Sequence, residues 1–351
     1  MIPIKVIKNR LGIASPPSFC TYIITWRCNG HCEMCDVWKK EKEDELKLKD
    51  IINIFKQLKL DVIRITGGEP FLREDLAQIV KAIQKYSRPK IIHITSNGIL
   101  TKRILSFFNE IEKKDNIHIK ISIDAVGEKH DKIRRVKDAY KSAMTTVKEL
   151  AKIKPKFNFY LGINQIIFDK NSLKDYQELK KICEPLNVPV HLVLAYKKVA
   201  LYAPEKNLNL MPKQDNEFPS LSYLPKEEIL EILDTLKKMV NSIPDFRERL
   251  TLNYDLKGLY NRLISKKGIP NPPCLALRSH LRILPNGDVP ICLSNSTVVG
   301  NLKKTPIKDL WFSKEIEKYR QIVKQCPGCW HECETIPSAI YSGDIIKGLF
   351  Y

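Results

Sequence analysis

Apolar runs of strand type alternate with segments of helical periodicity through the first 200 residues, and this alternation restricts the fold more than any other feature. Helices are predicted at 48–58, 76–86, 102–113, 140–151 and 173–183. Strands are predicted at 19–25, 62–66, 90–95, 117–123, 157–163 and 188–194. Such alternation forms a parallel α/β sheet through right-handed crossovers. Six units predict a partial (β/α)6 TIM-like barrel rather than a closed barrel of eight strands.

The 351 residues are enough for this barrel and one smaller unit. Four prolines between residues 197 and 226 break the alternating pattern, and a proline-rich stretch at 268–273 marks a second boundary. Helical patterns return between these boundaries, at 227–240 and 246–264. We therefore expect an N-terminal lead (1–18), the barrel (19–199), a linker and helical region (200–270), and a small C-terminal α+β domain (271–351).

Three cysteines follow the first predicted strand at the spacing C-x3-C-x2-C, namely Cys28, Cys32 and Cys35. Three thiolates this close in sequence can converge on one soft metal centre, and a cubane iron–sulfur cluster normally takes four cysteine ligands. One iron is then left without a protein ligand, and an open position on a metal centre is where chemistry is expected. From spacing alone, a zinc knuckle and three unrelated thiols remain alternatives.

Polar residues stand at the predicted C-terminal ends of the strands, which is where parallel barrels carry their chemistry. After the cysteine loop, these ends carry Gly67-Gly68-Glu69-Pro70, Ser96-Asn97, Ser122 with Asp124, and Asn164-Gln165. Asn, Ser and Gly also mark ordinary turns. That reading explains Asn97-Gly98 well, but it explains Glu69 and Asp124 less well. The ends therefore predict a site for a polar cofactor.

The cysteine triplet and the segment 67–70 together resemble the signature of the radical S-adenosylmethionine (SAM) enzymes. The resemblance implies that Cys28, Cys32 and Cys35 hold a [4Fe-4S] cluster, whose fourth iron is chelated by the amino and carboxylate groups of SAM. Reduction would release methionine and a 5'-deoxyadenosyl radical, which abstracts a hydrogen from the substrate. An electron donor of the ferredoxin or flavodoxin type is implied as a partner.

The same resemblance assigns roles around SAM. Backbone carbonyls of Gly67, Gly68, Glu69 and Pro70 would receive the methionine ammonium group, with Glu69 bracing that interaction. The two glycines would let the backbone approach the cofactor closely. Arg134 resembles a position where a cation meets the SAM carboxylate, and a solvated arginine is the alternative. Candidates for the ribose hydroxyls and the carboxylate are Ser96, Asn97, Ser122, Asp124 and Asn164.

A second group of cysteines comprises Cys274, Cys292, Cys326, Cys329 and Cys333. Its G-x4-C and C-x2-C-x3-C spacings resemble the SPASM or twitch extension of radical SAM enzymes, which binds auxiliary [4Fe-4S] clusters. Five cysteines suffice for one auxiliary cluster with one thiol to spare. Spacing does not settle which four bind. Cys274, Cys292 and Cys333 are the preferred ligands, Cys326 and Cys329 compete, and a structural zinc site is the alternative.

Two short apolar runs flank the turn residues Asn286-Gly287 within this second group. An Asn-Gly dipeptide between strand-like runs is a strong signal for a tight hairpin turn. We therefore expect a strand at 281–284 to pair with a strand at 289–291.

Composition adds little to this assignment. The formal charge of +19 suggests attraction to an anionic partner such as RNA, a lipid surface or an acidic peptide, but the positive residues are scattered and interleaved with acidic ones. No run approaches the roughly 18 apolar residues that span a bilayer. The first 15 residues offer no signal-peptide core, so we expect a cytoplasmic location.

The expected function is hydrogen abstraction from an unactivated C–H bond of an unidentified substrate. A small metabolite, a sugar, a lipid headgroup, a peptide and a protein all remain open as substrates. The auxiliary cluster would assist oxidation or bond formation. A radical SAM enzyme that modifies RNA is one alternative, and nucleic acid is not the favoured partner. A non-catalytic iron–sulfur or zinc protein is the other.

Overall fold

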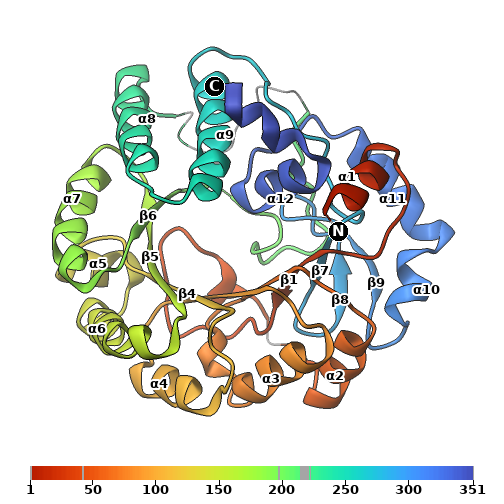
Figure 1. The fold of residues 1–351 in the computed structure, drawn as a ribbon, viewed down its shortest axis with the longest axis horizontal. Helices are drawn as coiled ribbons and strands as arrows, with labels where there is room; N and C mark the ends of the chain where they lie inside the picture. Colours follow the sequence, from red (N-terminus) through yellow and green to blue (C-terminus); the bar gives the residue numbers. More distant parts are fainter. Residues whose placement is uncertain (1, 42, 197, 214–220, 222, 351) are drawn as a thin grey trace.

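Seven parallel strands form the central sheet, in the order β6-β5-β4-β3-β2-β1-β7. The computed structural model describes residues 2–41, 43–196, 198–213, 221 and 223–350. The strands follow an arc that is open between β6 and β7 (Figure 1). Their bounds are β1 (Phe19–Ile23), β2 (Val62–Thr66), β3 (Ile91–Ser96), β4 (Ile117–Ser122), β5 (Tyr160–Ile167), β6 (Val190–Leu194) and β7 (His280–Ile283). The expected α/β class and partial barrel are confirmed.

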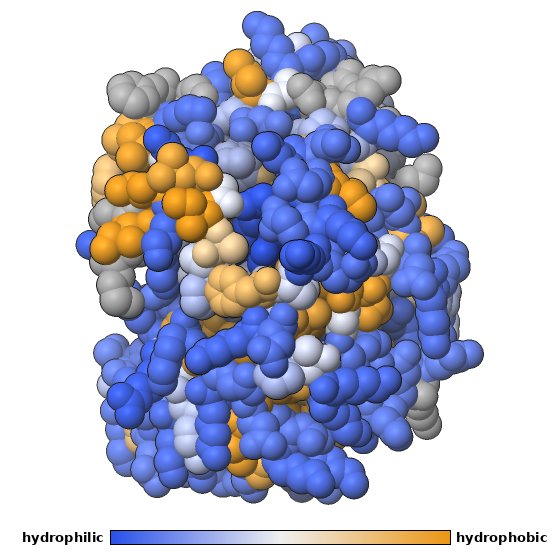
Figure 2. Space-filling view, turned by 90° about the vertical axis from the view of Figure 1, so that its right-hand side faces the viewer, coloured by the Kyte–Doolittle hydropathy of each residue, from blue (hydrophilic) through white to orange (hydrophobic). Residues whose placement is uncertain are grey.

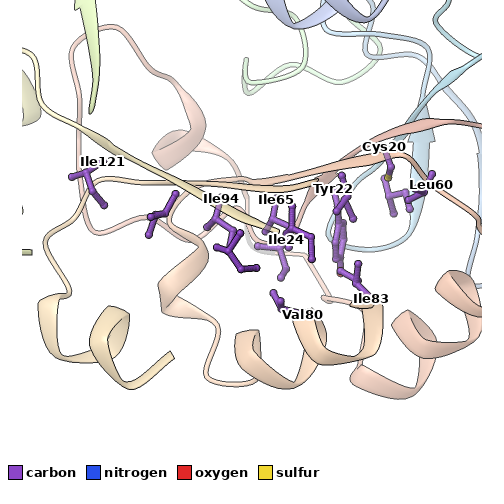
Figure 3. Packing of buried hydrophobic residues seen from close by; sticks show 14 of the residues in the cluster. Cys20, Tyr22, Ile24, Leu60, Ile65, Val80, Ile83, Ile94 and Ile121 are labelled. Atoms are coloured by element: carbon purple, nitrogen blue, oxygen red, sulfur yellow. The ribbon is translucent and has the colours of Figure 1, made fainter. Parts of the chain in front are cut away.

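Crossover helices cover the outer face of the arc. They are α2 (Leu48–Lys56), α3 (Leu76–Tyr86), α4 (Thr101–Glu110), α5 (Glu128–Arg134), α6 (Ala139–Phe157) and α7 (Asn171–Cys183). Every second residue of the strands points outward into the core between sheet and helices. Tyr22, Ile65 and Ile94 lie there with Val80 and Ile83 of α3, all of them buried (Figure 3). The alternate residues of each strand, which lie between these outward-pointing ones in the sequence, face the inside of the barrel.

The strand predicted at 157–163 begins and ends later in the structure. Helix α6 continues to Phe157, and Asn158 ends it in a left-handed conformation, with its N–H bonded to Lys154 O. Strand β5 then runs from Tyr160 to Ile167. Asn164 and Gln165 therefore lie inside the strand, not at its end.

The predicted hairpin is wrong, although its turn forms. Gly287 N donates to Leu284 O at 2.9 Å, as expected of the turn. Strand β7 pairs in parallel with β1, from Phe19 opposite His280 to Tyr22 opposite Ile283. Strand β8 (Asp288–Pro290) pairs instead with β9 (Val298–Asn301) in an antiparallel ribbon. The barrel thus gains its seventh strand from the C-terminal part of the chain, because β1 would otherwise expose an unpaired edge.

The remaining helices come from the first ten residues of the chain and from the part that follows β6. Helices α8, α9 and α12 lie along the open side of the arc, and α1 lies beside α12 (Figure 1). The segment after β6 packs on the C-terminal part of the chain, with Leu201 N bonded to Leu293 O at 3.1 Å. These helices are α1 (Ile2–Arg10), α8 (Lys226–Asn241), α9 (Phe246–Leu263), α10 (Ile307–Trp311), α11 (Lys314–Lys324) and α12 (Glu332–Ser342). Short 3-10 helices are η1 (Val37–Lys39), η2 (Pro70–Leu72), η3 (Glu184–Leu186) and η4 (Asp344–Phe350).

The face turned to the viewer in Figure 2 is mostly hydrophilic, with apolar residues gathered in a few areas. Exposed apolar side chains include Ile4, Ile7 and Leu11 near the N-terminus and Ile346 and Leu349 near the C-terminus. No helix within the described ranges is both long and apolar enough to cross a membrane.

Candidate active site

The loop after β1 brings the first three cysteines together. A Cβ built on Gly30 would lie 3.9 Å from Cys28 Sγ and 3.5 Å from Cys32 Sγ, so these two thiols flank one residue. Burial, with smaller contributions from Glu69, Cys32 and Cys35, raises the pKa of Cys28 to about 12. Two donors point at sulfur, Gly30 N to Cys28 Sγ at 3.4 Å and Arg134 Nη1 to Cys32 Sγ at 3.6 Å. Donors of this kind stabilise the thiolates of iron–sulfur sites.

Two neighbouring elements fix the conformation of this loop. The backbone N–H groups of His31 and Glu33 donate to Arg134 O and Ile133 O, both at 3.1 Å, at the end of α5. The side chain of Asn97, after β3, donates to Asn29 Oδ1 at 2.7 Å. The cysteine loop is therefore held between β3 and α5.

The glycines of the 67–70 segment are needed for contact with the chain that leads into the cysteine loop. Gly68 N donates to Thr25 O and Glu69 N donates to Arg27 O, both at 2.8 Å. A Cβ on Gly67 would lie 2.4 Å from Thr25 O, and one on Gly68 would lie 2.1 Å from Arg27 O. The sequence predicts the close approach of a cofactor at these glycines, whereas in the structure the protein backbone itself requires them.

Glu69 joins the ends of β2 and β3. Its Oε1 accepts from Phe71 N at 3.1 Å and from Ser96 Oγ at 2.8 Å, and its Oε2 accepts from Asn97 N at 2.7 Å. Burial raises the pKa of Glu69 to about 7, although these hydrogen bonds favour the carboxylate. Both carboxylate oxygens thus accept hydrogen bonds from the protein. Glu69, Ser96 and Asn97 thereby fix the ends of β2 and β3 next to the cysteine loop.

Asp124 and Arg134 form a buried ion pair behind Cys32. Arg134 Nε donates to Asp124 Oδ2 at 2.7 Å, and Asp124 Oδ1 accepts from Ile166 N at 3.2 Å. Burial alone would lower the pKa of Arg134, but Asp124 and Cys32 raise it above its usual value. Burial lowers the pKa of His130 to about 4, and its Nδ1 accepts from Asp124 N at 3.1 Å. Arg134 is therefore a buried cation beside a cysteine sulfur, not a solvated arginine.

Ser122 and Asn164 lie opposite each other in the register of β4 and β5. Asn164 Oδ1 is buried and accepts no hydrogen bond from any described residue. A buried carbonyl oxygen without a donor costs free energy unless a ligand supplies one. These two side chains face the barrel interior and remain candidates for ligand contact.

Four cysteines of the second group line one pocket, namely Cys274, Cys292, Cys326 and Cys329. Burial and the nearby Glu334, Cys274 and Cys292 raise the pKa of Cys329 well above its usual value. Cys333 lies apart, in a small cluster with Ile23, Trp26 and Cys35. This arrangement differs from the expectation that Cys333 is a preferred ligand and that Cys326 and Cys329 compete.

Glu334 connects this pocket with the barrel. It is buried and pairs with Arg282 of β7 at 2.6 Å, and His280 Nδ1 lies 3.2 Å from its other oxygen. Leu293 N donates to Glu334 Oε1 at 2.9 Å. Although burial opposes ionisation, Arg282 and His280 hold the pKa of Glu334 well below its usual value. The second cysteine group is therefore fastened to the seventh strand by a buried charge network.

Neither cysteine group has the geometry of a single-ion site. In the described part of the chain, no three His, Cys, Asp or Glu side chains converge as ligands of one metal ion. Cysteines that each bind a different iron of a cubane need not converge on one point.

Comparison with protein families gives two matches in the expected order. The radical SAM superfamily model matches residues 22–173, and the SPASM iron–sulfur cluster-binding domain matches residues 274–334. The chain is a member of the radical SAM superfamily. A radical SAM domain is thus followed by a SPASM domain, and the family implies SAM and iron–sulfur clusters as cofactors.

Its relatives catalyse several different reactions. Pre-heme d1 synthase of Dinoroseobacter shibae is 24% identical over 348 residues, covering 92% of this chain and 81% of that protein. GTP 3',8-cyclase of Aquifex aeolicus is 34% identical over 119 residues, covering 31% of this chain and 36% of the cyclase. The molybdenum cofactor biosynthesis protein moc-5 of Caenorhabditis elegans is 23% identical over 286 residues. That match covers 79% of this chain and spans 44% of moc-5, which is less than half.

Solved structures agree in fold. Streptococcus suis SuiB bound to S-adenosylmethionine superimposes with a TM-score of 0.60 at 18% identity, over 90% of this chain and 70% of SuiB. The enzyme anSMEcpe, bound to AdoMet and the Cp18Cys peptide, superimposes with a TM-score of 0.58 at 16% identity, over 96% of each chain. At these identities the likeness establishes the fold alone.

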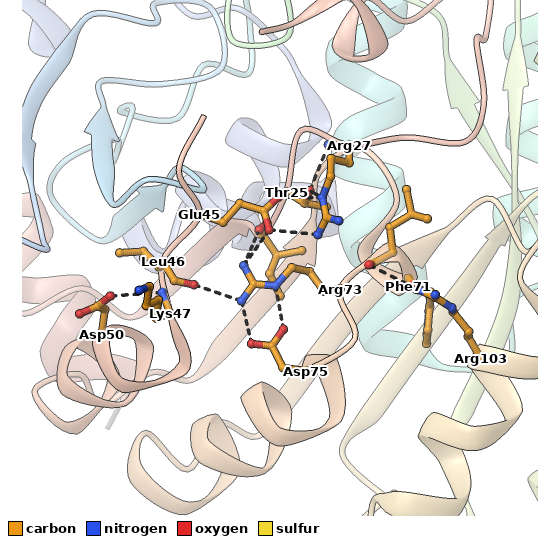
Figure 4. Close-up of polar contacts among 12 residues, drawn as sticks. Thr25, Arg27, Glu45, Leu46, Lys47, Asp50, Phe71, Arg73, Asp75 and Arg103 are labelled. Atoms are coloured by element: carbon orange, nitrogen blue, oxygen red, sulfur yellow. Dashed lines mark hydrogen bonds and ion pairs between the residues drawn. The ribbon is translucent and has the colours of Figure 1, made fainter. Parts of the chain in front are cut away.

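Arg73, which the sequence does not single out, links the two segments of the radical SAM site (Figure 4). Arg73 follows η2 and donates to Asp75 Oδ1 and Oδ2 at 2.8 Å, and it pairs with Glu45 at 3.1 Å. Glu45 in turn accepts from Arg27 at 3.2 Å, immediately before Cys28. A basic residue among Glu74, Asp75 and a helix start resembles an ordinary solvated side chain. No feature of the sequence distinguishes Arg73, because its partner Glu45 is distant in the sequence and only the fold brings the two together.

Proposed function

We propose that this enzyme cleaves SAM reductively at a [4Fe-4S] cluster on Cys28, Cys32 and Cys35, and that the resulting 5'-deoxyadenosyl radical removes a substrate hydrogen. The observation that carries the proposal is the placement of the three thiols. They share one loop, and that loop is hydrogen-bonded to the 67–70 segment, the β3 end and α5. The cluster, when bound, supplies the electron that breaks the sulfonium bond.

The residues predicted to bind SAM divide into two groups in this proposal. Ser122 and Asn164 contact the cofactor directly, because Asn164 Oδ1 is buried without a donor from the described residues. Backbone groups of the 67–70 segment contact the methionine part. Glu69, Ser96, Asn97 and Asp124 act as positioning residues, since their polar groups are engaged within the protein. Arg134 places a positive charge beside Cys32.

The auxiliary [4Fe-4S] cluster is proposed to use the four cysteines of the single pocket, Cys274, Cys292, Cys326 and Cys329. Cys333 is then the spare thiol. An auxiliary cluster in this place could take an electron from a substrate radical or anchor the substrate. A donor of the ferredoxin or flavodoxin type would supply electrons to the first cluster. The RNA-modifying alternative draws support only from the net charge of +19.

Iron and zinc analysis of anaerobically reconstituted protein tests the cluster assignment. Wild type should hold about eight irons, and the Cys28→Ala/Cys32→Ala/Cys35→Ala variant about four, because each cubane has four irons. Cys329→Ala should also lose about four irons. Cys333→Ala is the matched control, from the same C-x2-C-x3-C stretch, and should keep all of them. About four irons with one zinc in the wild type would contradict the auxiliary cluster.

Formation of 5'-deoxyadenosine tests the radical function. The reduced wild type, incubated with SAM, should produce 5'-deoxyadenosine that chromatography can quantify. The triple cysteine variant should produce none. A wild type that holds its clusters but yields no 5'-deoxyadenosine, with or without cell extract, would overturn the proposal.

A further inference from the structure

The interior of the barrel is polar along one register row that spans six of the seven strands. Parallel barrels are ordinarily filled by layers of Val, Ile and Leu. Here the residues paired across β7, β1, β2, β3, β4 and β5 are Arg282, Thr21, Arg64, His93, His118 and Tyr160. We call this row the polar floor. Two residues further along β4, Lys120 stands above it.

The direction of these side chains follows from their neighbours. Ile63 and Ile65 on either side of Arg64, and Ile119 and Ile121 on either side of Lys120, are buried in the core beneath the outer helices. Successive side chains of a strand point to opposite faces. Arg64 and Lys120 therefore point into the barrel, where both are half-buried and reachable from solvent.

Aromatic and imidazole rings form one wall of this space. The rings of His93 and His118 lie 5.1 Å apart, and those of His118 and Tyr160 lie 5.0 Å apart and stacked. Tyr160 Oη bonds to His191 Nε2 on β6. Burial and the charge of Lys120 lower the pKa of His118 to about 4 and that of His191 to about 3. These rings are neutral at pH 7 and leave the positive charge to arginine and lysine.

The cations of the barrel interior differ in whether a carboxylate pairs with them. Arg282 pairs with Glu334 at 2.6 Å, which satisfies its charge. Among the described residues, no ion pair joins Arg64 or Lys120 to a carboxylate within 4.0 Å, although the Arg64 guanidinium lies over the Phe19 ring, 5.5 Å from its centroid. The pKa of Lys120 lies below its usual value, because burial and Arg64 lower it more than Glu332 of α12 and Glu248 of α9 raise it. Charges that are partly removed from water are ordinarily paired, so two cations that line the barrel interior without a carboxylate partner favour an anion there.

In the row above the floor, the position beside Lys120 carries no side chain. Gly162 of β5 is the register partner of Lys120 and carries no side chain. A Cβ on Gly162 would lie 3.3 Å from the His191 ring and 3.1 Å from the Tyr160 ring, so a side chain there would crowd the wall. Ser122 and Asn164, the proposed SAM contacts, lie one inward-facing row further along the same strands. Lys120 therefore lies between the polar floor and the residues proposed to contact SAM.

We propose that Lys120 and Arg64 form a subsite for an oxyanion, a phosphate or carboxylate group of the substrate, inside the barrel on the side away from SAM. This inference rests on the proposed function, because it places the substrate between the radical source and the polar floor. Arg and Lys are the side chains best suited to phosphate and carboxylate groups. His118 and His191 donate or accept further hydrogen bonds as neutral rings.

Equilibrium dialysis of the cluster-loaded protein against labelled inorganic phosphate, and separately against labelled acetate, tests the subsite at constant ionic strength. Wild type should bind one equivalent of at least one of these anions. Lys120→Met should weaken that binding at least tenfold, whereas Lys120→Arg should restore most of it. Lys174→Met, which removes an exposed lysine from α7, changes net charge equally and should bind like wild type.

The outcomes separate this subsite from the radical function. Phosphate binding alone identifies a phosphorylated substrate group, and acetate binding alone identifies a carboxylate. Equal binding by wild type and Lys120→Met, or no binding of either anion to wild type, overturns the subsite. The Cys28→Ala/Cys32→Ala/Cys35→Ala variant should still bind the anion although it cannot cleave SAM. A wild type that forms 5'-deoxyadenosine but binds no anion would remove the subsite and leave the radical function standing.

Discussion

Among the residues around the first cluster site, Arg134 should contribute most to the free energy of unfolding. Its guanidinium pairs with Asp124 at 2.7 Å, and both side chains are buried. Replacing it by Met leaves a buried carboxylate without its partner, which costs about 3–5 kcal/mol. Urea unfolding of the cluster-free Arg134→Met protein should show a loss of this size.

The adjacent arginine provides the control for that prediction. Arg135 is 54% exposed, and its guanidinium lies 4.0 Å from Glu33. An exposed pair at this distance contributes about 0–1 kcal/mol. Arg135→Met should therefore unfold within about 1 kcal/mol of the wild type. Equal losses of unfolding free energy in the two variants would show that the buried Arg134–Asp124 pair stabilises the protein no more than the exposed pair does.

Glu69 should make the stability of the cluster-free protein depend on pH. Its folded pKa of about 7 lies above the ordinary value of 4.5. Between these values the folded state holds a proton that the unfolded state has lost, so the free energy of unfolding falls as pH rises. The fall is about 3 kcal/mol for a single group shifted by this amount. Glu69→Gln cannot ionise and should lose this component between pH 4.5 and 7.5 in urea titrations. Parallel curves for the two proteins would contradict the raised pKa.

Among single residues, the sequence predicted those whose chemistry is visible in spacing. Cys28, Cys32 and Cys35 share one loop, and Glu69 and Asp124 are buried beside it. Spacing could not show that Cys333 lies apart from the other four thiols, because that depends on how the chain enters α12. Lys120 and Arg64 were missed although a signal exists. Each is a single cation between isoleucines on a strand, and the alternation predicts that it faces the barrel interior.

At the scale of elements, the contact between the 67–70 segment and the β1 end should control SAM binding. Gly68→Ala places a methyl group where Arg27 O would be 2.1 Å away, so the segments must separate. SAM affinity of the cluster-loaded variant, measured by equilibrium dialysis, should fall at least tenfold.

Gly127→Ala is the matched control for that substitution. Gly127 has a φ of +63°, but a Cβ there meets no atom within 4 Å. Its ψ of −142° puts it in a region that only glycine adopts readily, so the expected effect is backbone strain of about 1–3 kcal/mol without a change in SAM affinity. If both variants bind SAM like wild type, the close contact of the two segments is not required.

Elements with a strong local pattern were predicted well, and those decided by distant partners were not. Helix α3 has the predicted bounds 76–86, because apolar residues at helical spacing bury one face of it. Strand β5 was displaced because α6 continues through Pro155 to Phe157, which the apolar run at 157–163 did not reveal. The apolar pattern of residues 281–284 is equally compatible with pairing to the next strand and with pairing to β1. Only the closure of the barrel edge decides between them.

For the whole molecule, β7 makes the barrel depend on the C-terminal part of the chain. A protein ending at residue 273 lacks the strand that covers β1 from Phe19 to Tyr22. It also lacks His280, whose ring bonds to Thr21 Oγ1 at 2.9 Å, and α12, which holds α1 through Arg10 and Ser342 O at 2.7 Å. An uncovered edge strand with polar groups left unpaired favours aggregation. The truncated protein should therefore lack a cooperative urea transition and fail to reconstitute the first cluster.

A full-length chain with Cys274, Cys292, Cys326 and Cys329 changed to Ser separates the strand from the cluster. This variant keeps β7 and the Arg282–Glu334 pair, whose atoms lie 2.6 Å apart, but has no thiols in the pocket. If β7 is what the barrel needs, the variant should unfold cooperatively and hold about four irons, those of one cubane. If the auxiliary cluster itself holds the C-terminal part in place, the variant should fail as the truncation does. A truncated protein that unfolds cooperatively and holds about four irons would show instead that six strands suffice for the radical SAM site.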